Sequence, residues 1–274
     1  MIQKWWNKYI FILVNAAIAV VIVFPLLYCL SGSFMTEGEI FSSVPRLLPS
    51  SLSGGNYAAA LRMAPLFRFI FNSAVVAVAC TFAQLLTGSL AGYAFALLKF
   101  KGQKTLFLLF LATMMIPGYA IIISNYLTIA NFKLNDTYAA LILPYMTSAF
   151  CVFNMRQAFL SLPSELNESA KIDGCNSLQF YYRIGLPLTV PFLGSLGIYT
   201  FLSVWNQYMW PLLVTNTTGM RTVQIGLGML RFADSNAFGP IMAGSIIVMI
   251  PSVAVFLLGQ KSLIKGLTTG AVKG

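Results

Sequence analysis

The chain has 274 residues, of which 58% are hydrophobic and only 9% are charged, and its mean hydropathy is +0.80. In soluble domains about a quarter of all residues are charged. The low charged fraction of this chain therefore excludes an ordinary soluble protein and indicates a membrane protein. The formal net charge is +10, but no basic face with stacking aromatics stands outside the apolar segments. The positive charge therefore points to membrane topology and lipid headgroups rather than to nucleic acid.

Six apolar windows without Asp, Glu, Lys or Arg are long enough to cross about 30 Å of hydrocarbon as helices. They cover residues 10–30, 70–96, 106–126, 137–155, 188–212 and 239–260. Membrane barrels have short alternating segments instead, so the pattern predicts an all-α polytopic membrane protein with six transmembrane helices. Pro117-Gly118 and Pro144 are places where a helix could be interrupted. We expect a first part over 1–67, a core with helices 2–6 over 68–262, and a C-terminal tail over 263–274.

The first window follows Lys4 and Lys8 and could be mistaken for a signal peptide. It spans about 20 residues, whereas a secretory apolar region has about 7–15. We interpret it as a retained span, with cleavage as the alternative. Placing both termini in the cytoplasm puts eleven of the 17 Lys and Arg residues there and six outside, which satisfies the positive-inside rule.

Several kinds of site lack their residues. The chain has no His, its four Cys are scattered, and it has no Walker-type Gly-Lys-Ser/Thr loop, so the sequence predicts neither a metal or redox centre nor an ATP site of that type. The windows also lack the ionisable side chains that ion-coupled transporters use. If the protein moves a solute uphill, the energy is expected to come from outside the membrane.

A polar segment at residues 164–186 separates the fourth and fifth windows. Ser164 is expected to cap a helix with Glu165 and Glu168 in its first turn, and Asp173-Gly174 is expected to end it. Asn176 or Ser177 can cap a second short helix. Two short helices at an angle would form a knob suited to a groove on a partner. The alternative is an ordinary cytoplasmic loop whose aromatics lie among the headgroups.

The same segment resembles the EAA loop of ABC-importer permeases. The matching residues are Glu168-Ser169-Ala170, Asp173-Gly174, Phe180, Ile184, Leu186-Pro187 and Pro191, with Ser169 and Cys175 departing from the usual alanines. Trp205-Asn206, Trp210-Pro211-Leu212, Met220-Arg221-Thr222 and the ending from Lys265 to Gly274 are similar to the carbohydrate-uptake group. That group includes the G-type maltose permease and the E-type glycerol-3-phosphate permease.

The resemblance implies a non-catalytic subunit of a larger machine in the bacterial cytoplasmic membrane. A second homologous permease, a pair of cytoplasmic ATPases that bind ATP and Mg, and an external solute-binding protein would complete it. No cofactor is expected on this chain. The implied ATPase contacts are Glu168, Ala170, Asp173, Gly174, Leu178 and Phe180 in the loop, and Gly266, Leu267, Thr268 and Gly270 in an extended tail. The implied binding-protein contacts are Thr215, Thr217, Thr218, Gly219 and Arg221.

The stretch VWNQYMWPLL supplies the substrate-pathway candidates Trp205, Asn206, Gln207, Tyr208 and Met209. A flat ring beside amide groups suits a sugar, although Trp and Tyr at this depth also mark a membrane interface. The resemblance favours a sugar or sugar-like solute. Glycerol phosphate or another non-sugar solute, a stand-alone channel or facilitator, and a membrane scaffold remain as alternatives.

Overall fold

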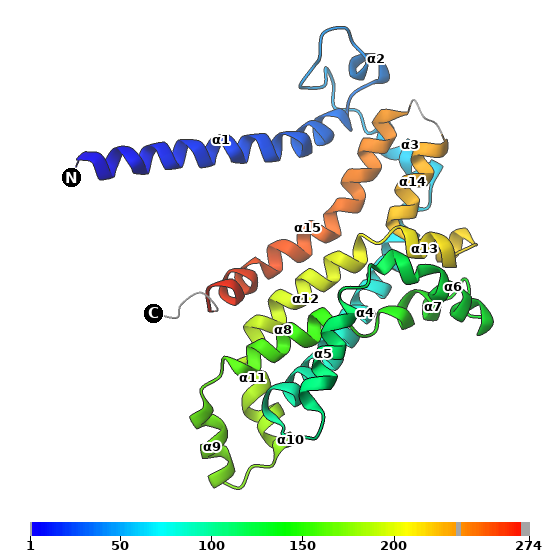
Figure 1. Cartoon of the computed structure of the whole chain (residues 1–274). Helices are drawn as coiled ribbons and strands as arrows, with labels where there is room; N and C mark the ends of the chain where they lie inside the picture. The colour runs from blue at the N-terminus through cyan, green and yellow to red at the C-terminus, as the bar shows by residue number, and fades with distance from the viewer. Residues whose placement is uncertain (1, 234–236, 270–274) are drawn as a thin grey trace. The chain divides into compact units, whose positions relative to one another are not determined.

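The computed structural model describes the backbone of residues 2–233 and 237–269, and the side chains of residues 10–231 and 237–261. Within these ranges every regular element is helical, as the sequence predicts (Figure 1). The chain divides into two compact units, residues 1–67 with 226–250 and residues 68–225 with 251–274. Among the described residues, three helices are long and apolar enough to cross a membrane, and up to six spans result if each bent helix pair counts as one.

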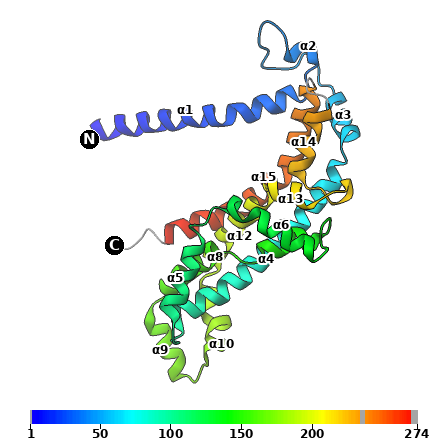
Figure 2. The same cartoon turned by 45° about the vertical axis from the view of Figure 1, so that its right-hand side comes forward.

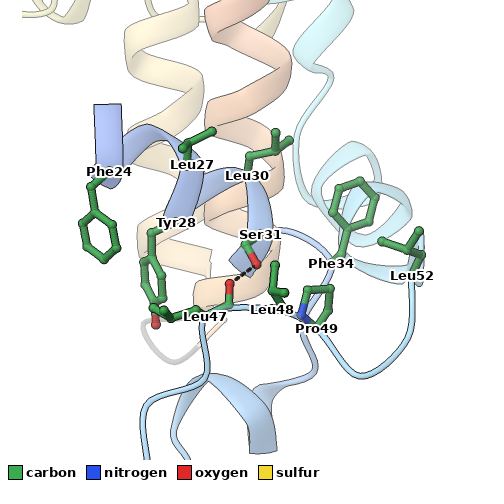
Figure 3. Close-up of a pocket in the computed structure, with 10 residues that line it drawn as sticks. All are labelled: Phe24, Leu27, Tyr28, Leu30, Ser31, Phe34, Leu47, Leu48, Pro49 and Leu52. Atoms are coloured by element: carbon green, nitrogen blue, oxygen red, sulfur yellow. Dashed lines mark hydrogen bonds between the residues drawn. The ribbon is translucent and has the colours of Figure 1, made fainter. Parts of the chain in front are cut away.

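The first unit contains α1 (Ile2–Gly32), α2 (Glu37–Ile40), α3 (Gly55–Met63) and parts of α14 (Val223–Ala233) and α15 (Phe238–Thr269). From residue 10 to residue 27 the side chains of α1 are exposed. Its last turns and the segment 47–52 form an apolar groove of about 420 Å³, shown in Figure 3. The hydroxyl of Ser31 donates a 2.6 Å bond to the carbonyl of Leu47 and ties the segment to the helix.

The second unit is built on α4 (Leu66–Leu97), α8 (Ala149–Leu160) and α12 (Val190–Trp205). Its other elements are α5 (Gln103–Thr113), η1 (Gly118–Ile121), α6 (Ile122–Asn131), α7 (Tyr138–Ile142), η2 (Leu143–Tyr145), α9 (Ser164–Ile172), α10 (Ser177–Phe180), η3 (Tyr181–Gly185, a π-helix), α11 (Leu186–Leu188), α13 (Met209–Val214) and η4 (Thr218–Met220).

The third, fourth and fifth windows each contain a break, two of them near the prolines named as possible interruptions. The third window bends by 89° between α5 and η1, and the fourth bends by 46° between η2 and α8. Pro117, the N-cap of η1, and Pro144, inside η2, account for these interruptions because proline cannot donate a backbone hydrogen bond. The fifth window also breaks, since α12 ends at Trp205 and α13 begins at Met209.

The last window forms one helix, α15, whose backbone continues to Thr269. The resemblance implies an extended segment over residues 266–274, but the helix continues through its first part to Thr269. Four tail residues are among the implied ATPase contacts. The structure describes only the backbone of Gly266, Leu267 and Thr268, and Gly270 lies outside the described residues.

Candidate functional site

The polar segment between α8 and α12 folds as two short helices, as the sequence predicts. α9 begins one residue earlier than the sequence predicts. Its N-cap is Pro163 instead of Ser164, and Ser164 is its first helical residue. Asp173 is the C-cap and Gly174 follows with φ +79°, the left-handed conformation that favours glycine. Asn176 caps α10 in a capping box, since its side chain accepts from the Gln179 N–H and the Gln179 side chain accepts from the Asn176 N–H.

We call α9, the turn at 173–176 and α10 the knob. In Figures 1 and 2 the knob extends beyond the ends of α8 and α12. Glu168 and Asp173 are exposed, and so are two large apolar side chains, Ile172 at 86% and Leu178 at 63%. Ala170 and Phe180 are buried in the second unit's core. The knob thus has a buried side that holds it and an exposed side with carboxylates beside apolar groups.

An aromatic cluster holds the buried side of the knob. Tyr93 on α4 packs against Phe159, Phe180 and Tyr181 with ring centroids 5.4, 6.3 and 5.2 Å away. The Tyr93 hydroxyl donates a 2.7 Å bond to the carbonyl of Ser177, and the hydroxyls of Ser89 and Tyr181 lie 2.8 Å apart. Sequence reasoning missed Ser89 and Tyr93, because they lie in an apolar window and their partners are about 90 residues away in the chain.

α4 also approaches α8 closely. A Cβ atom on Gly88 would lie 2.8 Å from the Cβ of Cys151, and one on Gly92 would lie 2.7 Å from the Cβ of Met155. The Gly-xxx-Gly spacing is a common means of close helix packing in membranes. α4, α8 and the knob are therefore joined in one packed block.

A hollow of about 390 Å³ lies where α12 breaks before α13. Four of the five substrate-pathway candidates line it: Asn206, Gln207, Tyr208 and Met209. The other lining residues are Gly118, Tyr119, Ile122, Tyr145, Ser203 and Trp210. Residues near the breaks in the third and fourth windows thus line the same hollow as residues near the break after α12. The sequence does not indicate that these three breaks lie together.

The two tryptophans of this stretch serve packing. Trp205 is outside the lining of the hollow, only 2% exposed, and stacks on Phe201 at 5.6 Å. Trp210 is equally buried, and its indole N–H donates a 3.1 Å bond to the carbonyl of Ala140. Tyr119, Tyr145 and Tyr208 also line the hollow, and Tyr119 is 75% exposed.

Two further hollows continue along α12. One of about 200 Å³ shares Tyr145, Ser203 and Gln207 with the first. The next, of about 240 Å³, shares Phe150 and Tyr199 with the second. The series therefore follows one face of α12 and continues onto α8.

The bend between η2 and α8 is stabilised from α4. Gln84 donates a 2.7 Å bond to the carbonyl of Tyr145, and Thr87 donates a 3.2 Å bond to the carbonyl of Met146. Inside a membrane, carbonyls released by a helix break need such partners because water is absent. These two bonds make the irregular backbone beside the hollows stable.

The segment 214–222 is fixed at both ends within the second unit. The Asp136 carboxylate accepts from the backbone N–H groups of Asn216 and Thr217 at 2.9 and 3.0 Å. The Thr217 N–H is the main reason that the pKa of Asp136 is lowered from its ordinary value of 3.8. These bonds fix the start of the segment.

Asn72, which is fully buried, fixes the other end of the segment. Its amide donates to the carbonyls of Gly219 and Arg221 at 2.8 and 2.9 Å, and its oxygen accepts from Tyr138 at 2.7 Å. Thr217, Thr218 and Gly219 are exposed, whereas Thr215 is 4% exposed and donates to the carbonyl of Pro211. The exposed part of the segment is therefore a small, rigid projection.

Known proteins with similar sequences are transport permeases. The chain is 36% identical over 262 residues to the arabinooligosaccharides transport system permease protein AraQ of Halalkalibacterium halodurans, with 94% of each chain covered. It is 36% identical over 257 residues to the sn-glycerol-3-phosphate transport system permease protein UgpE of Rhizobium meliloti, with 90% of this chain and 91% of the relative covered.

The fold is also known from a solved structure. A chain from the crystal structure of a bacterial ABC transporter involved in the import of the acidic polysaccharide alginate matches with a TM-score of 0.80 and 21% identity, over 93% of this chain and 97% of that one. Residues 84–268 match the family described as binding-protein-dependent transport system inner membrane component. The chain therefore belongs to this family of inner-membrane permease subunits.

Proposed function

We propose that the chain is one of two permeases of an ATP-driven importer for a sugar or sugar-like solute, and that it has no catalytic role of its own. It crosses the membrane six times with both termini in the cytoplasm, each bent helix pair forming one span. The observation that carries the proposal is the knob, which connects α8 to α12 and exposes Glu168, Ile172 and Leu178 on helices anchored by Phe180.

The knob is the contact with an ATPase that binds ATP and Mg. Helix-in-groove docking uses apolar side chains flanked by charges, and the exposed side of the knob offers both. When the ATPase pair closes, the knob moves with α4 and α8. The aromatic cluster and the close approach of Gly88 and Gly92 to α8 join these elements. A two-state rocking of packed blocks then changes the side from which the pathway is open.

The remaining partners follow from the exposed surfaces. Exposed apolar side chains on α1 suit lipid and the second permease. The projection at Thr217–Gly219 is the contact with the external binding protein, together with Arg221, while Thr215 supports it from within. Residues 266–274 contact the ATPase pair. The hollows along α12 are the solute pathway, with Asn206, Gln207, Tyr208 and Met209 facing the solute and Trp205 packing behind them.

Copurification tests the ATPase contact. The variant Leu178→Asp should insert in the membrane with its partner permease but lose the ATPase, because a carboxylate in an apolar groove is desolvated without a partner. Ser43→Asp adds the same charge at an exposed serine outside the knob and should keep the full complex. Retention of the ATPase by Leu178→Asp, with normal ATP-dependent uptake in proteoliposomes, would refute the proposed docking site.

Two further experiments test the other contacts. A cysteine at Thr217 should crosslink to the binding protein in the outward-open complex, and crosslinks found only elsewhere would reject this assignment.

Deleting residues 266–274 should leave insertion intact but weaken assembly or the coupling of ATP hydrolysis to transport. A truncated chain that transports at the full rate would exclude a role for the tail.

A further inference from the structure

The first hollow has a lining that matches hydroxyl groups and ring faces. Tyr119, Tyr145 and Tyr208 contribute flat aromatic surfaces, and Ser203, Asn206 and Gln207 contribute hydroxyl and amide groups. Its volume of about 390 Å³ falls in the range of about 300–1,000 Å³ that is usual for small-molecule sites. Aromatic faces pack on the C–H faces of a ring, while amides can both donate to and accept from its hydroxyls.

Asn206 is held in one orientation. The side-chain nitrogen of Gln224 donates a 3.1 Å bond to the Asn206 side-chain oxygen. The Asn206 NH₂ group therefore serves as a donor to a ligand, and a hydroxyl or ether oxygen is a suitable acceptor. Because the orientation is set before binding, little freedom is lost when a ligand binds.

The electrostatics of the hollow favour an uncharged ligand. α12 is a 16-residue helix whose C-cap is Asn206, so its C-terminal end lies at the hollow. The C-terminus of a helix carries about half a negative charge, and none of the described residues of the lining is Asp, Glu, Lys or Arg. A phosphate placed here would lose its hydration and meet the negative end of the dipole, whereas a neutral hydroxyl-rich ring would not.

The series of hollows also has the form of an extended ligand. From Phe192 to Asn206 the lined face of α12 is about 21 Å long, at about 1.5 Å per residue. The described residues that line the second and third hollows are also uncharged, and they include Gln84, Ser148, Asn154, Ser195 and Thr200. An oligomer of rings has both the length and the hydroxyl groups for this face.

We infer that this chain's part of the pathway accepts an uncharged oligosaccharide and disfavours anionic solutes such as sugar or glycerol phosphates. The inference rests on the proposed function and narrows it. The two relatives are named for different solutes, arabinooligosaccharides and sn-glycerol-3-phosphate. The inference favours a solute like the first, which is uncharged, over the second, which is an anion. The donor set Asn206, Gln207 and Ser203 and the ring face of Tyr119 determine this selectivity.

Uptake by the complete importer, reconstituted in proteoliposomes with its binding protein and ATPase pair, tests the inference. The probes are labelled arabinotriose, xylotriose and maltotriose as neutral oligosaccharides, and labelled glycerol-3-phosphate as the anion. We expect ATP-dependent uptake of at least one trisaccharide, at least tenfold faster than that of glycerol-3-phosphate. Uptake of glycerol-3-phosphate without uptake of any trisaccharide would overturn the inference and leave ATP-driven import intact. Uptake that needs no ATP would instead refute the proposed function.

Two pairs of variants, each a test and its control, separate recognition from folding. Asn206→Asp removes the donor and adds a negative charge, so the half-saturating trisaccharide concentration should rise at least tenfold, while Asn131→Asp, at an exposed position at the end of α6, should leave it unchanged. Tyr119→Ala should raise it several-fold, and Tyr119→Phe, which keeps the ring, should restore most of the affinity. Unchanged trisaccharide kinetics in Asn206→Asp and Tyr119→Ala, with normal assembly, would contradict the inference.

Discussion

The hydroxyl of Tyr93 on α4 donates a 2.7 Å hydrogen bond to the backbone carbonyl of Ser177, the first residue of α10. The bond links two positions 84 residues apart and connects α4, which is long and apolar enough to cross a membrane, to the knob. Beside it, the hydroxyls of Ser89 and Tyr181 are 2.8 Å apart in a buried site. Two short polar contacts inside an aromatic cluster thus determine the position of the knob relative to α4.

Removing the Tyr93 hydroxyl should loosen this connection. Tyr93→Phe keeps the ring contacts but leaves the Ser177 carbonyl without that partner, and a typical hydrogen bond contributes about 0.5–1.5 kcal/mol. We expect the variant to assemble and hydrolyse ATP but to transport less solute per ATP. Tyr182→Phe is the control, since Tyr182 is 47% exposed in the same π-helix and Phe preserves its ring. Equal transport per ATP in the two variants would exclude the proposed role of Tyr93.

Gly174 should tolerate asparagine better than valine. Its φ of +79° suits glycine, and no atom lies within 4 Å of a Cβ placed there, so backbone conformation rather than space limits the substitution. A left-handed conformation costs an ordinary residue about 1–2 kcal/mol, and asparagine less. Gly174→Val should therefore weaken ATPase binding and transport while Gly174→Asn retains most of both. Copurification and uptake measure this, and equal loss in both variants would point to the exposed surface instead of the turn.

The sequence predicted the knob because its signals are local. The cap at Asn176 and the turn at Gly174 depend on neighbours within three or four residues, and both lie where the pattern placed them. The helix breaks are only partly predictable from the sequence. Pro117 and Pro144 indicate two of them, but no proline or glycine indicates the break directly after Trp205.

Long-range contacts could not be predicted from one sequence. Tyr119 and Tyr145 enter the same hollow as Asn206 only because three broken windows meet there. The sequence also does not indicate that Trp205 is buried against Phe201 and is not among the residues that line the hollow. Likewise, nothing near Asn72 in the sequence indicates that it binds the carbonyls of Gly219 and Arg221, about 150 residues away.

Gly92 should resist even alanine. The added Cβ would lie 2.7 Å from the Cβ of Met155 and 2.8 Å from the backbone nitrogen of Arg156, so α4 and α8 would have to separate. Overpacking of this kind costs about 1–3 kcal/mol, and we expect Gly92→Ala to lower the melting temperature in detergent. Gly38→Ala, where no atom lies within 4 Å, is the control. A melting temperature equal to that of the control would show that the helix pair adjusts freely.

The order of the projection at Thr217–Gly219 should depend on pH through Asp136. Because the folded-state pKa of Asp136 is lowered from 3.8, mainly by the Thr217 N–H, its stabilising effect is complete above about pH 4 and is lost as pH falls through the lowered value. Asp136→Asn is the suitable variant: the residue has φ +63°, which asparagine tolerates, and only the charge is removed. Amide hydrogen exchange over residues 214–219, corrected for the intrinsic effect of pH, should be faster in the variant than in the wild type at pH 7. The two proteins should converge below the folded-state pKa, because a protonated Asp136 no longer offers a charged acceptor to Asn216 and Thr217. Identical exchange at pH 7 would mean that Asn72 alone holds the segment.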